Sequence, residues 1–345
     1  MHQGDPMRAV IAGFGAMGRR HALAISRVEG LELSGICDLR AEALAAEEAP
    51  AAAARSTDLS QLLRQERPDL VVVAATAPSH RPVVAAAIDA GARAILCEKP
   101  IACSLSDARW IVDACRSAGV DLAVNHCRRH VAAYGWVARR VQSGEWGSLR
   151  AIRTSCPGIG LGCLGTHFLD LMRFLSGQEF KAVSGWVDGE LRANPRGLQF
   201  HDPGGLIVAE TVGGARFVHQ QIEDGAGPVS IVVELTQARI VVEEADGRVD
   251  VVWKDPNVRP GPGSTTRAER LQPPPDAPLR LDIVEMTADV LRELVAGSPL
   301  TCSGEHGYRS LEALVAAYVS SEAGHVPQLL PLSRSSELHR ELPIT

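Results

Sequence analysis

One lysine of this chain, at the end of an apolar run, stands where a side chain could take part in chemistry. Lys99 stands in CEKPI, residues 97–101, directly before Pro100. Of the 35 lysine and arginine residues only three are lysines, at positions 99, 181 and 254. A surface charge could be either type, but a group that must release a proton or act as a compact donor in a pocket can only be lysine. The position therefore indicates a chemical role, against the alternative of a solvated loop charge.

A glycine-rich turn near the N-terminus has the spacing of a dinucleotide-binding site. GFGAMG, residues 13–18, follows the strand-like run Met7–Ala12 and precedes a stretch with helical apolar spacing. Gly13 would allow a tight turn, and Gly15 would let the backbone approach a pyrophosphate at the helix N-terminus. Asp38 ends the next predicted strand, where a carboxylate would hold the adenosine ribose hydroxyls. The alternatives are a glycine turn without a ligand and, for Asp38, an ordinary turn residue.

The elements that must position these residues alternate in the first half of the chain. Strands are expected at Met7–Ala12, Leu31–Cys37, Leu70–Ala75, Ala94–Cys97 and Val120–Val124, and helices at Pro82–Ala90 and from the Ser104-x-x-Asp107 start to about Ser117. The strand at 94–97 delivers CEKPI. Alternating βαβ units predict a parallel sheet with helices on both faces.

The second half is dominated by strand-like runs. Strands are expected at Ala151–Cys156, Lys181–Asp188, Leu206–Thr211, Ala215–Ile222, Val229–Leu235, Arg239–Glu243 and Val249–Trp253, in an antiparallel or mixed sheet. Residues 254–280 carry seven prolines and are interpreted as a long surface loop without regular structure. Helices are expected at Asp282–Ala296 and Glu305–Ala323, with Ser303 capping the second.

Length and composition limit the class of protein. At 345 residues the chain is expected to form two domains, 1–125 for the dinucleotide and 126–345 for substrate and oligomerisation, with the final helix and tail able to pack back on the first. The hydrophobic and charged contents, 46% and 22%, are those of an ordinary globular protein. The net charge of −6 argues against nucleic acid as the main partner.

Three further sequence features concern the compartment. No apolar run approaches the roughly 18 residues of a membrane span. The leader MHQGDP lacks a basic region followed by an apolar stretch, so no signal peptide is expected. The eight cysteines include no CxxC pair and are interpreted as reduced thiols of a cytoplasmic chain.

Seven motifs in one order resemble the glucose–fructose oxidoreductase / inositol dehydrogenase (Gfo/Idh/MocA) family. They are GFGAMGRRH at 13–21, ATAPSH at 75–80, EKP at 98–100, NHCRRH at 125–130, SGEWGSL at 143–149, GTHFLDLMRFLSG at 165–177 and SGEHGYRSLEALVAAYVSS at 303–321. Each alone is loose, but together they run nearly end to end. The resemblance implies an N-terminal Rossmann domain with a doubly wound parallel sheet. It also implies a C-terminal α+β domain whose large, mostly antiparallel sheet helps form a homodimer or homotetramer.

The resemblance also implies the reaction and its two central groups. A hydride would pass between NAD, or NADP, and a hydroxyl or keto group of a sugar, amino sugar or cyclitol. Lys99 aligns with the family's lysine between nicotinamide and substrate, where an ammonium can stabilise a developing alkoxide. His167 aligns with the catalytic histidine, whose ordinary pKa near 6.5 suits a general acid or base. Asp170, one helical turn on, would orient His167 or bind a neighbouring hydroxyl.

Other residues are assigned from the same motifs. Asn125, Arg128 and Arg129 match a stretch that lines the active-site floor, although either arginine could instead form a surface ion pair. His80 would lie near the nicotinamide or pack at a helix start, and Pro100 would fix its turn through a cis bond. The cofactor-binding candidates are Gly13, Phe14, Gly15, Ala16, Met17, Gly18, Asp38, Leu39, Arg40, Ala75, Thr76, Ala77, His80, Glu98, Lys99 and Pro100.

One residue departs from the family pattern. Cys163 stands where inositol dehydrogenase-like members carry an aspartate, four residues before the histidine, and it is assigned to substrate binding. A thiol does not replace a carboxylate, so the expectation for the substrate changes. The cofactor assignment rests on other residues and is unaffected. Cys163 and His167 have a spacing that could bind a metal, but no further ligands converge and none is expected.

Two other functions remain open at the level of sequence. One is a non-catalytic regulator that binds a dinucleotide, and the other is an NAD-dependent glycosidase that uses transient oxidation. For the cofactor, the charge of Asp38 predicts NAD over NADP, although Arg40 nearby could compensate a 2′-phosphate.

Overall fold

The computed structural model describes residues 6–158, 160–189, 197, 199–222, 225–254, 268–271 and 277–344, with the backbone alone for 268–271. The chain divides into two compact units. The first comprises Met1–Cys127, Asp282–Leu311 and Leu338–Thr345, and the second Arg128–Leu281 and Glu312–Glu337. The first break lies two residues from the predicted boundary, and residues 282–311 and 338–345 group with the first unit. The functional assignment of each domain stays a prediction.

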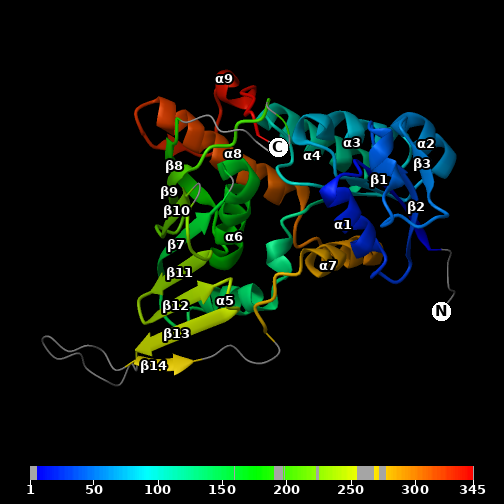
Figure 1. Cartoon of the computed structure of the whole chain (residues 1–345). Helices are drawn as coiled ribbons and strands as arrows, with labels where there is room; N and C mark the ends of the chain where they lie inside the picture. The colour runs from blue at the N-terminus through cyan, green and yellow to red at the C-terminus, as the bar shows by residue number, and fades with distance from the viewer. Residues whose placement is uncertain are drawn as a thin grey trace, which may run out of the picture. The chain divides into compact units, whose positions relative to one another are not determined.

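The first unit contains a six-stranded sheet in the order β3-β2-β1-β4-β5-β6 (Figure 1). Its strands are β1 (Met7–Ala12), β2 (Leu31–Cys37), β3 (Ala54–Ser56), β4 (Leu70–Val73), β5 (Ala94–Cys97) and β6 (Asp121–Val124). All neighbouring pairs are parallel. The predicted doubly wound parallel sheet is confirmed, and β4 is buried along its whole length because both faces of the sheet are covered.

Helices of the first unit follow the predicted spacing. They are α1 (Ala16–Ile25), α2 (Leu59–Glu66), α3 (His80–Asp89), α4 (Leu105–Ala118) and α7 (Ile283–Ala296), with short 3₁₀ turns η1 (Ala41–Ala45) and η2 (Ala77–Ser79). The predicted cap of α4 is confirmed, since Ser104 Oγ accepts a hydrogen bond from the Asp107 N–H at 3.2 Å. Sequence reasoning did not identify β3, α2 or the two turns.

The second unit contains a nine-stranded sheet in the order β14-β13-β12-β11-β7-β10-β9-β8-β15. Its strands are β7 (Leu149–Pro157), β8 (Phe180–Val187), β9 (Gly205–Thr211), β10 (Arg216–Ile222), β11 (Ser230–Leu235), β12 (Ala238–Glu243), β13 (Arg248–Lys254), β14 (Ala268–Leu271) and β15 (Gln328–Leu329). The pair β7 and β10 is parallel, and every other neighbouring pair is antiparallel. The large, mostly antiparallel sheet is therefore confirmed.

The expectation of an irregular loop at 254–280 is wrong in part. Residues Ala268–Leu271 form β14, which pairs with β13 in antiparallel register, Val251 opposite Leu271 and Lys254 opposite Ala268. The segment AERL contains no proline, so each of its N–H groups can join a strand ladder even though prolines lie on both sides. The predicted loop at 255–267 and 272–276 lies outside the described residues.

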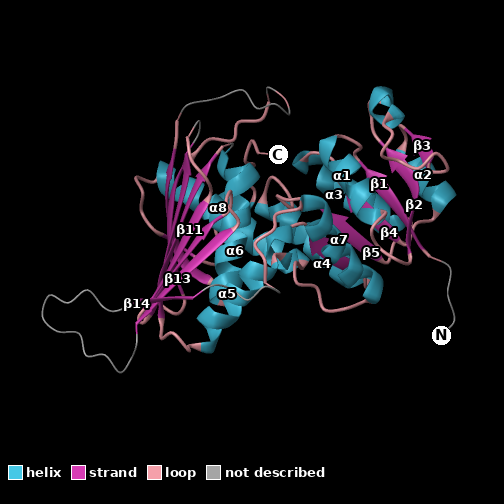
Figure 2. Cartoon of the chain, turned by 60° about the horizontal axis from the view of Figure 1, so that its bottom comes forward, coloured by secondary structure: helices cyan, strands magenta, loops and turns pink. Residues whose placement is uncertain are grey.

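Helices cover one face of this second sheet (Figure 2). They are α5 (Ala132–Ser143), α6 (Thr166–Ser176) and the second half of α8 (Gly304–Glu322), which passes from the first unit into the second. At Gly185 of β8 a Cβ would lie 2.2 Å from the Ala317 carbonyl oxygen of α8, so only glycine permits this approach. Along β11 the side chains of Ile231 and Val233 are buried and those between them are half-buried.

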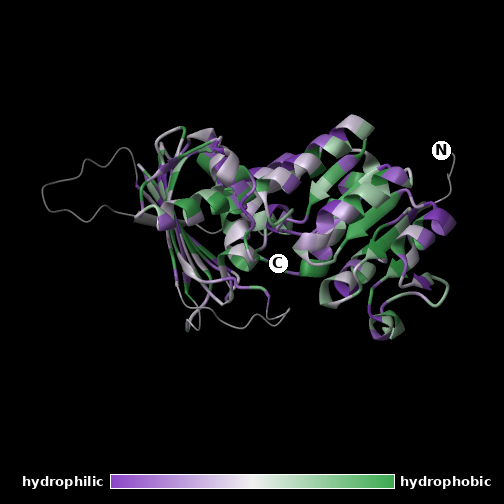
Figure 3. Cartoon of the chain, turned by 90° about the horizontal axis from the view of Figure 1, so that it is seen from above, coloured by the Kyte–Doolittle hydropathy of each residue, from purple (hydrophilic) through white to green (hydrophobic). Residues whose placement is uncertain are grey.

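The two sheets differ in hydropathy, as Figure 3 shows. The strands β4 and β5 of the first unit carry apolar residues throughout, whereas strands of the second unit such as β7 and β10 mix apolar and polar residues. This is the difference expected between a sheet buried on both faces and one covered on a single face.

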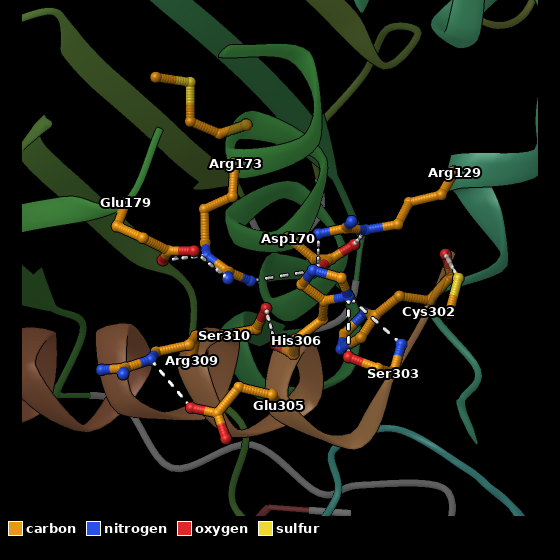
Figure 4. Close-up of polar contacts among 12 residues, drawn as sticks. Arg129, Asp170, Arg173, Glu179, Cys302, Ser303, Glu305, His306, Arg309 and Ser310 are labelled. Carbon is orange, nitrogen blue, oxygen red and sulfur yellow. Dashed lines mark hydrogen bonds and ion pairs between the residues drawn. The ribbon is translucent and has the colours of Figure 1, made fainter. Parts of the chain in front are cut away.

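The start of α8 differs in detail from the predicted cap. Ser303 stands directly before the helix as expected, but its hydroxyl and its N–H both lie 3.2 Å from Nδ1 of His306 (Figure 4). The imidazole thereby accepts the N–H of the residue before the helix, as a glutamate does in a capping box. The eight cysteines are thiols, as expected. Among the described residues no helix is long and apolar enough to cross a membrane.

Candidate active site

The carboxyl edge of the first unit's sheet gathers many of the predicted site residues. The chain leaves β1 into the glycine turn, β2 into Asp38, β5 into Glu98 and Lys99, and β6 into Asn125. Because β1 lies between β2 and β4, the strand order reverses there, and ligands of open parallel sheets bind at such a switch point.

The glycines of the turn at 13–18 divide into two kinds. Gly13 has φ +96°, and a Cβ there would lie 2.5 Å from the Ala75 nitrogen; at Gly18 a Cβ would lie 2.1 Å from the Gly13 oxygen. Packing of the protein itself therefore requires both. At Gly15, among the described residues beyond its chain neighbours and its own helix, a Cβ would have within 4 Å only Nη2 of Arg40, at 3.8 Å. Space is thus left beside the N-terminus of α1, and it fits the close approach of a pyrophosphate.

Asp38 is held in position at the end of β2. Its Oδ2 accepts the Phe14 N–H at 2.8 Å, and its Oδ1 accepts the Arg40 N–H at 2.9 Å. The Arg40 guanidinium lies 3.4 Å from the same Oδ1. The neighbouring Leu39 side chain is 90% exposed, a large apolar surface beside the carboxylate. The Asp38 carboxylate is therefore fixed in position, and the Phe14 ring is buried.

Glu98 forms the centre of a buried polar network. Its Oε1 lies 2.8 Å from Nε2 of His21 and accepts the Asn125 amide at 2.8 Å, and its Oε2 accepts the Lys99 N–H at 3.2 Å. Burial opposes ionisation of the carboxyl, but hydrogen bonds from His21 and Asn125 and the charges of His21 and Lys99 outweigh it and lower the pKa of Glu98 to about 2. Glu98 is therefore a permanent anion beside Lys99.

The network also shows how two of the predicted site residues are held. The side chains of Glu98, a cofactor-binding candidate, and Asn125, a substrate-binding candidate, are buried and turned toward each other, and both roles stay predictions. Asn125 also donates to Thr287 of α7 at 3.3 Å. Their observed contacts fix the turn that carries Lys99, and sequence reasoning missed His21 and Thr287. The Lys99–Pro100 peptide is cis, as predicted.

His80 opens α3 and is buried. Its Nε2 lies 3.0 Å from the Ala75 oxygen, while its Nδ1 faces the Ile101 oxygen at 3.2 Å and Sγ of Cys97 at 3.4 Å. Burial lowers the pKa of the imidazole, which favours the neutral form. Of the two alternatives for His80, packing at a helix start describes its contacts. Through these contacts the ring connects the loop after β4, residues 75–77, with the CEKPI segment, residues 97–101.

In the second unit one helical stretch carries Cys163, His167 and Asp170. A π-helical turn η4 (Gly160–Gly165) runs directly into α6, so Cys163 and His167 lie four residues apart on the same face. Single π turns inside helices are frequent at functional sites. The Cys163 side chain is buried.

Asp170 is the middle of a chain of charged groups in the second unit (Figure 4). Arg129 binds its carboxylate with two hydrogen bonds, Nε to Oδ2 at 2.6 Å and Nη2 to Oδ1 at 2.8 Å. Arg173 lies 3.5 Å from Oδ1 and binds Glu179 with two further hydrogen bonds at 2.7 and 2.6 Å. The ion pair of Arg129 is buried, unlike the surface pair considered as an alternative, and its place on the active-site floor stays a prediction. The partner Arg173 could have been found from its helical spacing to Asp170.

Arg128 is also engaged in a buried group. Its Nη1 pairs with Oε1 of Glu244, which also accepts the Tyr134 hydroxyl. The guanidinium lies 5.0 Å from the ring centroid of Phe168, the residue after His167. Arg128 thus braces the start of α6, and a substrate contact for it stays a prediction. Nothing in the sequence pointed to Glu244, which lies 116 residues away.

Beneath α6, the inward face of the sheet changes from apolar to polar along β7 and β10. The inward residues are Ile152, Thr154 and Cys156 on β7 and Phe217, His219 and Gln221 on β10. Thr154 Oγ1 lies 2.7 Å from Nδ1 of His219, whose ring stacks on Phe168 at 5.1 Å. Burial lowers the pKa of His219 to about 4 and raises that of the Cys156 thiol to about 11. Both groups are neutral at pH 7, and sequence reasoning missed them although their alternation follows strand spacing.

In the part of the chain that the structure describes, no three histidine, cysteine, aspartate or glutamate side chains lie together in an arrangement that could hold a metal ion.

Comparison with known proteins shows what this chain is similar to. Residues 7–126 match the GFO_IDH_MocA model, described as an oxidoreductase family with an NAD-binding Rossmann fold. D-apiose dehydrogenase of Paraburkholderia graminis is 29% identical over 356 residues, covering 94% of this chain and 90% of that one. Inositol 2-dehydrogenase 3 of Saccharopolyspora erythraea is 28% identical over 61% of this chain and 64% of its own. The solved structure of levoglucosan dehydrogenase with NADH and levoglucosan superposes with a TM-score of 0.80 over 95% of this chain and all of that one, at 19% identity.

Proposed function

We propose that the chain is an oxidoreductase of the Gfo/Idh/MocA family, whose NAD-binding model matches residues 7–126, and that it transfers a hydride between NAD and a hydroxyl or keto carbon of a sugar or cyclitol. The observation that carries this proposal is the carboxyl edge of the six-stranded sheet. There the space at Gly15, the fixed carboxylate of Asp38 and the turn with Lys99 follow strands of one sheet. The names of the relatives support the substrate class, since they act on apiose, inositol and levoglucosan.

Binding of the cofactor would use the turn at 13–18 and the end of β2. The N–H groups at the start of α1 would face the pyrophosphate, Asp38 would accept the ribose hydroxyls, and exposed Leu39 would lie against the adenine. NAD, when bound, supplies the nicotinamide that accepts or returns the hydride. A 2′-phosphate would meet the charge of Asp38, so NAD is preferred over NADP even with Arg40 nearby.

Lys99 and His167 would act on the substrate oxygen. The Lys99 ammonium donates a hydrogen bond to the reacting oxygen and stabilises negative charge there as the C–H bond breaks. His167 takes the hydroxyl proton during oxidation and returns it during reduction. The Glu98 carboxylate, ionised throughout the neutral range, keeps a negative charge beside Lys99 and fixes the turn that carries it.

The test is the absorbance of NADH at 340 nm with D-apiose, inositol and levoglucosan as separate substrates, each with NAD and with NADP. Turnover of at least one compound with NAD, and weaker turnover with NADP, is expected. Binding of NAD without turnover of any of the three would favour the regulator, and cleavage of a glycoside without net NADH would favour the glycosidase. Equal or tighter binding of NADPH would contradict the cofactor preference.

We also propose that the chain forms a homodimer or homotetramer through the second sheet. Helices cover one face of this sheet, while the other carries Val232 and Val241, which pair across β11 and β12, and partly exposed Val252 and Trp186. Apolar side chains on such a face gain by burial against a second copy. Light scattering at micromolar concentration tests this, and a monomeric mass would count against it.

A further inference from the structure

The helical stretch that carries Cys163 and His167 is capped from a distant part of the chain. Its first N–H groups point to residues 202–203, at the entrance to β9. The Leu161 N–H donates to the Pro203 oxygen at 2.9 Å. The next two, of Gly162 and Cys163, donate to Oδ1 and Oδ2 of Asp202, each at 2.6 Å. Three consecutive donors are thus satisfied by a segment about forty residues further on.

The chemistry of this contact requires a carboxylate. The first N–H groups of a helix have no partners within the helix, and they carry the positive end of its dipole. Asp202 is 8% exposed, and both of its oxygens accept a short hydrogen bond. Hydrogen bonds to an ionised acceptor are about twice as strong as neutral ones. An amide of the same shape has only one acceptor atom, so it could satisfy only one of the two donors.

The glycines of the turn are arranged around Asp202. At Gly160 a Cβ would lie 1.9 Å from the Asp202 carbonyl oxygen and 2.3 Å from its carboxyl carbon. No side chain fits there, so the glycine-rich sequence before His167 permits the approach of residues 202–203. Thr166 Oγ1 closes the turn by donating to the Gly162 oxygen at 3.0 Å. The position of Cys163 is thus determined from both sides.

We propose that Asp202 is a positioning residue of the substrate site, which as a remote N-cap holds Cys163 and, one turn later, His167 in the orientation that the reaction needs. The reaction is the proposed one, so this inference rests on the proposed function. Asp202 is assigned to positioning because each of its oxygens accepts a backbone N–H of the turn. A displacement of about 1 Å at a reacting group can cost about a hundredfold in rate, which sets the size of the expected effect.

The first experiment separates positioning from plain stabilisation. Asp202→Asn and Asp202→Ala are compared with Asp246→Asn, which changes an exposed carboxylate in the turn between β12 and β13. At a temperature where circular dichroism shows all variants folded, kcat with the substrate found above should fall about tenfold for Asn and about a hundredfold for Ala. The KM for NAD should be unchanged, and Asp246→Asn should match the wild type. A lower Tm with unchanged kcat and KM would overturn the proposal, since Asp202 would then only stabilise the fold.

A second experiment is independent of turnover. Alkylation by iodoacetamide, mapped to each cysteine by mass spectrometry, should be faster at Cys163 in Asp202→Ala than in the wild type. Cys97, which is fully buried in the first unit, serves as the internal reference. Amide exchange of the peptide around 160–170 should rise in the same variant. Unchanged alkylation and exchange would reject the cap even if no substrate is found, whereas a wild type that turns over none of the three compounds would reject only the proposed function.

Discussion

The two units hold their site residues in different ways. In the first, the glycine turn, Asp38, Lys99 and Asn125 each follow a strand of one parallel sheet, so the topology alone brings them to one edge. In the second, Cys163, His167 and Asp170 lie on one helical stretch, which is held by charged groups from elsewhere in the chain. Those groups are Asp202, Arg129 and, through Phe168, Arg128.

Because of this difference, the two units should respond differently to substitutions near their site residues. An edge built by parallel strands keeps its position as long as the sheet forms, because its inner strands β4 and β5 are buried along their whole length. A helix held by buried ion pairs depends on each partner, since removal of one leaves the other charged and uncompensated. The buried titratable groups differ as well: Glu98 in the first unit is a stabilised anion, and His219 in the second is a histidine kept neutral.

The largest effect should come from the two proposed acid–base groups, one in each unit. Lys99→Met keeps the aliphatic stem and removes the ammonium, and His167→Asn removes the titrating ring. Each should lower the rate of hydride transfer by about 10²–10⁴-fold, the usual contribution of general acid–base catalysis. NAD binding, followed by NADH fluorescence, should survive both. Lys181→Met, an exposed lysine of β8, is the control. Loss of turnover in that control, or full activity in Lys99→Met, would contradict the assignment.

The anion in the first unit should make stability depend on pH in the acid range. The pKa of Glu98 is about 2 when folded and ordinarily 4.5, so its stabilising contribution is complete above pH 4.5 and is lost as pH falls toward 2. Linkage predicts that the wild type loses about 2 kcal/mol of unfolding free energy between pH 7 and pH 3 through this group. Urea titrations should show a smaller loss for Glu98→Gln. Equal losses in both proteins would show that the network does not hold the carboxylate ionised.

The neutral histidine in the second unit should make stability depend on pH at higher pH values than Glu98 does. The pKa of His219 is about 4 when folded and ordinarily 6.5, so the unfolded chain binds the proton first as pH falls. The wild type should therefore lose about 2 kcal/mol between pH 7 and pH 5 and about 1 kcal/mol more by pH 4, with little further loss from this group below pH 3. His219→Gln should not show this step. Tryptophan fluorescence suits the measurement, because Trp136, Trp146, Trp186 and Trp253 lie in the second unit.

The smallest effect should come from the residue that departs from the family pattern. A neutral thiol at 163 has no proton-transfer role in the proposed reaction, so Cys163→Ser should lower kcat by less than about tenfold, or ~1.4 kcal/mol. Cys163→Asp should raise the apparent pKa of His167 in the pH–rate profile, since a nearby carboxylate favours imidazolium. If Cys163→Ser is as damaging as Lys99→Met, a thiol-based mechanism must replace the one proposed.

Prediction from sequence succeeded where the signal was local. The apolar runs ending at Ala12, Cys37 and Cys97 predicted their strands, and Ser104 predicted its cap, because period, capping and turn chemistry act over a few residues. It failed for β14, where the prolines on either side hid a short segment able to pair. It also failed for β3, which is only three residues long, and for the short helix α2, although the Asp58 cap and the apolar spacing of α2 are present in the sequence.

For the site, the sequence by itself determined which residues stand at the strand ends and which share a helical face: the turn at 13–18, Asp38, Lys99, Cys163 and His167. Only the tertiary structure decided which of the polar groups hold others in place. Asp202 binds Cys163 across 39 residues, Arg129 binds Asp170 across 41, and His21 pairs with Glu98 across 77. The strand order and register of the folded sheets decide which residues become neighbours. A buried charged group is stable only beside an opposite charge or a hydrogen-bond partner. A local sequence pattern spans only a few residues, so it does not show which two residues dozens of positions apart come into contact.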